Sequence, residues 1–140
     1  MKLEQIKLVQ DSFASVEPSA DVVADLFYGR LFTLDPSLQA LFPAEMAEQK
    51  HKLMSMLKLA VNSLNRLDDL IPAVQALGQR HGTYGVTFEM YDTVGAALLW
   101  TLEQGLGEKF TPEVKAAWAA VYTLLANTMK QAQSMEAVAA

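Results

Sequence analysis

The stretch that decides the fold covers residues 70–81 and reads LIPAVQALGQRH. Positions i, i+4, i+7 and i+11 of an α-helix share one face, and here they hold Leu70, Val74, Leu77 and His81. An imidazole in line with three aliphatic side chains costs free energy if it is buried without a partner. Two kinds of partner could satisfy the His81 imidazole. The commoner is a backbone carbonyl or a hydroxyl, and the other is a metal ion that binds the free ring nitrogen.

The rest of the chain has the same helical period, and no stretch alternates as a strand does. We expect the central helix to be capped by Asp68 or Asp69 and to be ended by Gly82 and Gly85. The predicted helices cover residues 3–17, 18–34, 36–42 (a short segment), 46–64, 70–81, 87–104 and 112–133, the last with Thr111 as its N-cap. The sequence therefore predicts an all-α domain of six to seven helices over residues 1–133, followed by a tail, 134–140, that has little to bury and frays.

Composition excludes several classes of protein. The 140 residues carry a net charge of −5, include no cysteine and contain no run close to the ~20 apolar residues of a membrane span. The charge argues against a nucleic-acid partner, and the lack of cysteine excludes disulfides and thiolate metal sites. The N-terminal residues do not form the apolar segment of a signal peptide, so we expect a cytoplasmic protein with no membrane partner.

Two further polar residues lie on otherwise apolar helix faces. Gln49 and His81 are about 24 and 18 Å from the turn that joins their helices, at a rise of ~1.5 Å per residue. If these helices diverge, the space between them is an apolar slot with an imidazole on one wall and an amide on the other, which suits a flat, mostly hydrophobic cofactor. Taken singly, Gln49 is better explained as a surface glutamine on the first turns of its helix than as a ligand contact.

Tyr28 is the third polar residue that the pattern points inward, because Ala24, Leu31 and Phe32 surround it on its helix. Alone, it is equally well explained as a core tyrosine bonded to a carbonyl. Its neighbour Gly29 costs ~1 kcal/mol relative to alanine inside a helix, so we expect another helix to cross closely there.

The ordered set of these residues resembles the globins, and in particular bacterial single-domain haemoglobins and the globin part of flavohaemoglobins. The resemblance extends over about residues 3–132. Its pieces are LFYGRLF at 26–32, the segment 36–42 ending in Leu41-Phe42, Gln49 with Leu53 one turn later, LGQRH at 77–81, and the pair Tyr91 and Trp118. No single piece is a strong motif, but the set in this order and at these spacings is highly specific, and it favours the metal as the partner of His81.

The resemblance implies a globin fold that encloses haem b, with His81 as the proximal iron ligand. It places Tyr28 and Gln49 on the distal side, where the gas binds, and Phe42 against the haem face. The remaining implied haem contacts are the apolar residues Leu53, Leu77, Val86 and Val94, and Arg80, which is placed to reach a propionate. The implied small-molecule partners are dioxygen, nitric oxide and carbon monoxide.

The distal pair indicates which gas the site favours. Dioxygen on ferrous haem is a partly anionic acceptor, and a hydrogen bond to such a group contributes about 1.5–3 kcal/mol. Two donors therefore predict slow release and high affinity for dioxygen, whereas the less polarised carbon monoxide gains less. This favours a protein that binds dioxygen reversibly, for transport or scavenging.

One position departs from the flavohaemoglobin pattern, in which a tyrosine and a glutamate assist the proximal histidine. Tyr91 matches the tyrosine, but the glutamate is replaced by Gln133, a neutral amide that cannot push electron density toward the iron. The alternative function, a nitric-oxide dioxygenase or weak peroxidase, is thereby weakened, and we expect such turnover to need a separate reductase. The segment Gly105-Leu106-Gly107 is not a dinucleotide fingerprint, because it precedes no βα unit.

Two other hypotheses remain at this point. The first is a haem-free interaction or sensor domain, against which the joint presence of His81, Phe42, Tyr28 and Gln49 argues. The second makes His51 a sixth iron ligand in the gas-free state. His51 lies about 200° around its helix from Gln49 and should face solvent, so this would require the helix to rotate or unwind.

Overall fold

The computed structural model describes residues 2–83 and 86–139, with side chains described for 2–80 and 86–134. The described part contains six α-helices and no strand: α1 (Leu3–Val16), α2 (Ala20–Leu34), α3 (Ala47–Asn62), α4 (Leu67–Thr83), α5 (Phe88–Leu106) and α6 (Pro112–Ala139). Short 3-10 helices cover Glu17–Ser19, Pro36–Leu41 and Gly107–Lys109. The all-α prediction is confirmed.

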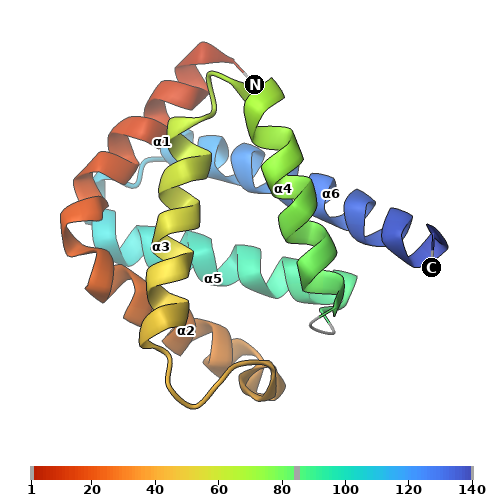
Figure 1. The fold of residues 1–140 in the computed structure, drawn as a ribbon. Helices are drawn as coiled ribbons and strands as arrows, with labels where there is room; N and C mark the ends of the chain where they lie inside the picture. The colour runs from red at the N-terminus through yellow and green to blue at the C-terminus, as the bar shows by residue number, and fades with distance from the viewer. Residues whose placement is uncertain (1, 84–85, 140) are drawn as a thin grey trace.

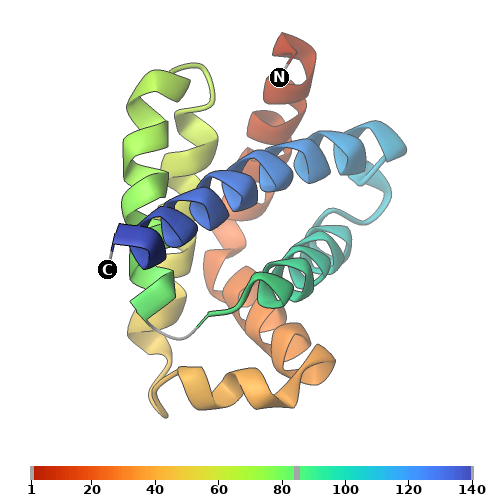
Figure 2. The same cartoon turned by 90° about the vertical axis from the view of Figure 1, so that its right-hand side faces the viewer.

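The helices cross in two layers. Figure 1 shows α3 and α4 descending from the turn that joins them and diverging, with α5 and α6 passing behind. The view in Figure 2 shows α4 lying across the C-terminal half of α6. The extensive helix pairs are α4 with α6 and α2 with α5; α3 lies against α1 and α2. Within the described residues, α3 and α4 are not packed on each other along their length, so the two walls expected of a slot are separate.

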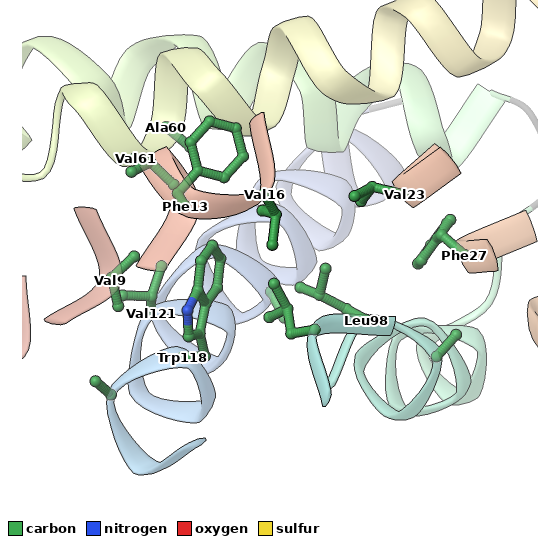
Figure 3. Close-up of a cluster of buried hydrophobic side chains, with 14 of the residues drawn as sticks. Val9, Phe13, Val16, Val23, Phe27, Ala60, Val61, Leu98, Trp118 and Val121 are labelled. Carbon is green, nitrogen blue, oxygen red and sulfur yellow. The ribbon is translucent and has the colours of Figure 1, made fainter. Parts of the chain in front are cut away.

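The core fixes α6 to the N-terminal helix. Trp118 is 2% exposed, and its indole Nε1 donates a 2.8 Å hydrogen bond to the hydroxyl of Ser12 in α1. The Phe13 ring lies 6.4 Å from the Trp118 ring, centroid to centroid. Figure 3 shows these aromatic side chains among aliphatic residues contributed by several helices. A buried indole needs such a partner, and this one anchors the first half of α6.

Two helices, α4 and α6, differ from their predicted bounds. The central helix begins at Leu67, so Asp68 and Asp69 lie in its first turn and do not cap it. Their negative charges interact favourably there with the positive end of the helix dipole. The helix continues through Gly82 to Thr83, and Gly85 lies outside the described residues. α6 runs on to Ala139, beyond the predicted end at residue 133, through a segment that includes the good helix formers Met135, Ala137 and Ala139.

The boundaries of the other helices follow the predicted signals closely. The hydroxyl of Thr111 accepts a 3.2 Å hydrogen bond from the amide of Val114, which confirms the expected N-cap of α6. Gly107, with φ of 57°, ends α5 in a backbone conformation that favours glycine. No helix of the described residues is both long and apolar enough to cross a membrane.

The close helix crossing occurs at a different glycine from the one expected. A Cβ at Gly29 would meet nothing within 4 Å, so the prediction of a crossing there is wrong: this residue faces outward on α2. A Cβ at Gly78 would lie 2.5 Å from the carbonyl oxygen of Met129 and 2.7 Å from its Cα. Gly78 therefore allows α4 to approach the backbone of α6 more closely than any side chain would permit.

Replacing each of these glycines by alanine is expected to have opposite effects on stability. Gly78→Ala forces two backbones apart and should lower the free energy of unfolding by about 1–3 kcal/mol, as overpacking does. Gly29→Ala, the matched control, adds helix propensity at an open position and should raise it by about 1 kcal/mol. Urea unfolding of both variants measures the difference, and a Gly78→Ala protein as stable as the parent would contradict the close crossing.

Candidate functional site

The two polar residues predicted for the distal side meet in the structure. Tyr28 lies in the middle of α2 and Gln49 in the first turn of α3. The Gln49 amide Nε2 donates a 3.2 Å hydrogen bond to the Tyr28 hydroxyl oxygen. A phenol oxygen that accepts a hydrogen bond still has its own hydrogen to donate. The pair can therefore present a donor that is held in place by a second residue.

Burial keeps this phenol neutral. Tyr28 is 5% exposed, and burial raises the pKa of its hydroxyl above the ordinary value of 10.0, while the hydrogen bond from Gln49 acts in the opposite direction. A neutral phenol is the form that donates, so Tyr28 remains a donor throughout the neutral pH range.

Aromatic side chains fix the orientation of the Tyr28 ring. Its centroid lies 5.0 Å from that of Phe27 and 5.5 Å from that of Phe42, both in edge-to-face contact. Phe42 directly follows the 3-10 helix Pro36–Leu41, which begins where the Asp35 carboxylate accepts a 3.1 Å hydrogen bond from the amide of Ser37. The corner between α2 and α3 thus places Phe42 against Tyr28, as aromatic pairs prefer.

The apolar residues predicted to touch a cofactor share one property: each is only partly buried and packs against the core. These residues are Phe42, Leu53, Leu77, Val86 and Val94. They come from the α2–α3 corner, α3, α4, the second turn of α5 and the position two residues before α5. Large apolar side chains left partly exposed on diverging helices fit a flat apolar group that would cover them. Arg80 is exposed on α4, where a charged side chain can reach solvent or a carboxylate.

The predicted iron ligand lies in α4, but its side chain lies outside the described residues. His81 belongs to the last turn of this helix. Two earlier residues of its predicted stripe, Leu70 and Val74, are each 3% exposed, and Leu77 is partly buried. The stripe therefore faces the core up to the turn that carries His81, and the ligand role stays a prediction.

On the other side of the site, the structure joins Tyr91 to Gln133. The Tyr91 hydroxyl donates a 2.9 Å hydrogen bond to the Gln133 Oε1. The amide of Gln133 in turn donates a 2.6 Å hydrogen bond to the carbonyl oxygen of Val86. Sequence reasoning paired Gln133 with Tyr91 but missed the contact with the Val86 backbone, because a carbonyl acceptor has no sequence signal.

A third tyrosine, in α6, also belongs to this region. The Tyr122 hydroxyl donates a 2.5 Å hydrogen bond to the carbonyl oxygen of Tyr91. The Tyr122 ring reaches this carbonyl by lying over Gly95, where an added Cβ would come within 2.7 Å of it. A glycine inside an apolar helix was the available signal for this close approach.

The buried tyrosines predict how stability depends on pH. Burial raises the pKa of Tyr28, Tyr91 and Tyr122, and for Tyr122 the charges of Tyr91 and Asp92 act in the same direction. Above about pH 10 the unfolded chain loses these protons while the folded chain keeps them, so unfolding becomes easier as pH rises. The loss is up to about 1.4 kcal/mol per pH unit for each such tyrosine.

Urea unfolding between pH 8 and 11.5 measures this loss. Tyr122→Phe removes one of the groups and should make the decline above pH 10 shallower than in the parent. A parent whose urea midpoint is constant from pH 9 to 11 would contradict the protonated burial of these phenols.

His51 occupies the position expected of a solvated residue. It is exposed on α3 and borders a surface hollow that Asp21, Lys50 and Met54 also line. Next to it, the Lys50 ammonium pairs with the Asp25 carboxylate at 2.8 Å. No group of three or more potential metal ligands from histidine, aspartate and glutamate occurs among the described residues. Because the His51 side chain is exposed on α3, an axial role for it would require this helix to rotate or unwind.

Comparison with known proteins shows which family and which proteins this chain is similar to. A family model described as Globin matches residues 25–129. Neuroglobin from Danio rerio is 29% identical over 136 residues, which cover 87% of this chain and 86% of the relative. A flavohemoprotein from Bacillus subtilis is 26% identical over 125 residues, and these cover 87% of this chain but 31% of that protein.

One solved structure extends the comparison. An engineered carbene transferase from Rhodothermus marinus, derived from a protein assigned as a nitric oxide dioxygenase, superposes with a TM-score of 0.85 at 25% identity. The match covers 100% of this chain and 99% of the other. The expected fold is therefore confirmed.

Proposed function

The chain belongs to the globin family, and from this premise we propose that it holds haem b through His81 and binds dioxygen reversibly beside Tyr28 and Gln49. The observation that carries the proposal is the hydrogen bond from the Gln49 amide to the buried Tyr28 hydroxyl. Haem supplies a ferrous iron at which a diatomic gas can bind. All other contributions to gas binding come from residues of the chain itself.

Each residue has a defined part in this proposal. The Tyr28 hydroxyl would donate a hydrogen bond to the gas, and Gln49 and the edge-to-face contacts with Phe27 and Phe42 hold the phenol in place. A donor that needs no reorientation stabilises a partly negative acceptor at little entropic cost. The partly buried residues Leu53 and Val94 exclude water from the same space. Together these features favour slow release of dioxygen.

An absorption spectrum of the purified protein, expressed with ample haem, tests the proposal directly. We expect one haem per chain, identified as haem b by its pyridine complex, and a spectral change that reverses when dioxygen is removed and readmitted. A folded protein that remains colourless under these conditions would overturn the proposal and would favour the haem-free interaction domain.

A second function, nitric-oxide dioxygenase activity, is favoured by one finding. The matched structure from Rhodothermus marinus derives from a protein assigned to that activity, and its chain aligns over full length. The chain spans about a third of the length of the flavohemoprotein that it matches, so any reductase partner is itself a proposal. The neutral Gln133 beside Tyr91 argues against strong oxygen activation and so against peroxidase chemistry.

One measurement distinguishes the two functions. Nitric oxide is added to the oxygenated protein, with and without a flavin reductase and its reduced nicotinamide donor. Sustained consumption that requires the reductase supports the dioxygenase, while a single stoichiometric reaction supports the oxygen-binding function.

A further inference from the structure

Two side-chain contacts lie next to each other where α3 meets α2 (Figure 1). The first is the 3.2 Å hydrogen bond from the Gln49 amide to the Tyr28 hydroxyl. The second is an ion pair made by the next residue of α3, in which the Lys50 ammonium lies 2.8 Å from the Asp25 carboxylate. Asp25 and Tyr28 are three residues apart, so they are neighbours on the surface of α2. The hydrogen bond and the ion pair therefore connect the same part of α2 to the same turn of α3.

The ion pair lies at the surface of the protein, whereas the Tyr28 hydroxyl lies inside. The exposed fraction of the side chain is 35% for Lys50 and 63% for Asp25. Successive residues of an α-helix point in directions about 100° apart, so Gln49 can face inward while Lys50 reaches the outer side of α2. The ion pair is thus placed to hold the two helices together from outside the space beside the Tyr28 hydroxyl.

The start of α3 has few other restraints among the described residues. Its N-cap residue, Met46, makes no side-chain hydrogen bond to the helix. The Glu45 carboxylate accepts a 3.1 Å hydrogen bond from the amide of Ala47, and the Lys50 amide donates a 2.9 Å hydrogen bond to the Met46 carbonyl. Gln49 therefore lies in a terminal turn, and the terminal turns of helices fray readily. A side-chain contact that holds this turn also determines where the Gln49 amide lies.

We propose that Asp25 and Lys50 are positioning residues for the distal side: their ion pair holds the first turn of α3 against α2 and so keeps the Gln49 amide within hydrogen-bonding distance of the Tyr28 hydroxyl. This inference rests on the proposed function, in which that hydroxyl donates a hydrogen bond to the gas. When the ion pair opens, the phenol loses the contact that orients it, and dioxygen is released faster. Because salt screens exposed charges, the release of dioxygen then depends on ionic strength.

A set of variants separates the ion pair from the general stability of α3. Lys50→Met and Asp25→Asn each break the pair, and a double variant carries both changes. Lys50→Arg keeps the positive charge and can still pair with the carboxylate. Lys58→Met is the matched control, because Lys58 forms a second surface ion pair of α3, 3.6 Å from the Glu17 carboxylate. Stopped flow measures dioxygen release at about 0.01 M and about 1 M salt, where the Debye length is about 30 and 3 Å.

We expect Lys50→Met, Asp25→Asn and the double variant to release dioxygen about 1.5- to 5-fold faster than the parent at low salt, the factor that an exposed ion pair supports. The three accelerations should be equal, because the same contact is lost in each protein. High salt should accelerate release from the parent toward the rate of Lys50→Met and should leave Lys50→Met itself unchanged. Lys50→Arg and Lys58→Met should match the parent, and carbon monoxide release should change little in every variant.

The sign of the Asp25→Asn effect distinguishes a positioning role from a direct effect of charge on the gas. A partly negative acceptor is stabilised by a nearby positive charge and destabilised by a negative one. A direct effect would therefore speed release in Lys50→Met and slow it in Asp25→Asn, whereas loss of positioning speeds release in both. Slower release in Asp25→Asn, effects that add in the double variant, or a parent whose release is independent of salt would overturn the proposal.

Backbone amide exchange without haem keeps a failure of this inference distinct from a failure of the proposed function. The amides of residues 50–54 should exchange faster in Lys50→Met and Asp25→Asn than in the parent and in Lys58→Met, while exchange in α1 stays the same. Equal exchange in all four proteins would overturn the role of the ion pair. If the parent takes up no haem, the proposed function fails, whereas this comparison still decides whether the ion pair holds the start of α3.

Discussion

Alanine at position 81 is expected to yield a folded protein that retains essentially no haem. The chain has two histidines and no cysteine, and His51 is exposed on the outer face of α3. In the proposed function His81 is the iron ligand, so removing its imidazole would remove that ligand. The ratio of haem to protein, from the pyridine complex and the protein absorbance, should fall from about one to near zero.

The control for this variant is the same substitution at the other histidine. His51→Ala should keep the haem content and the spectrum of the parent, because its side chain faces solvent. Circular dichroism shows whether each variant remains helical, and imidazole added to the His81→Ala protein should restore part of the pigment by occupying the vacated position. Parent-like haem content in His81→Ala would remove the basis of the proposed function.

The second large effect is expected from Tyr28→Phe, which should release dioxygen roughly 10- to 150-fold faster. The substitution deletes the donor but keeps the ring, so the edge-to-face contacts with Phe27 and Phe42 remain. The factor follows from about 1.5–3 kcal/mol for a hydrogen bond to a charged acceptor. Stopped-flow displacement of dioxygen measures the dissociation rate in the parent and in the variant.

Carbon monoxide serves as the internal control for the same protein. It is a weak acceptor, so its dissociation rate should change by only a small factor in Tyr28→Phe. Gln49→Leu should show an intermediate acceleration for dioxygen, since it removes the group that holds the Tyr28 hydroxyl. Equal acceleration for both gases would indicate a change in the volume available to the gas and not the loss of a hydrogen-bond donor. This result would contradict the role of Tyr28.

The parent should also release dioxygen at a rate that is nearly independent of pH between 6 and 9. Burial raises the pKa of the Tyr28 hydroxyl above 10.0, so the donor keeps its proton throughout this range.

Much of the local structure was determined by the sequence itself. The positions of apolar residues predicted each of the α-helices, because helix formation in a folded domain depends on an apolar face with a period of 3.6 residues. Thr111 and Pro112 predicted the start of α6 correctly, since capping depends on neighbours within one turn. The same local reasoning placed His51 on a solvated face. The start of α4 was missed by a turn because acidic residues suit both the cap and the first turn.

Only the tertiary structure decided which of these helix faces meet. Gly29 and Gly78 have the same intrinsic cost in a helix, yet only Gly78 lies against another backbone, since close approach depends on the crossing of α4 with α6. The contact of Gln133 with the Val86 carbonyl joins residues 47 positions apart through an acceptor that every residue carries. Sequence thus specifies the faces that helices bury, whereas the pairing of those faces follows from packing of the whole chain.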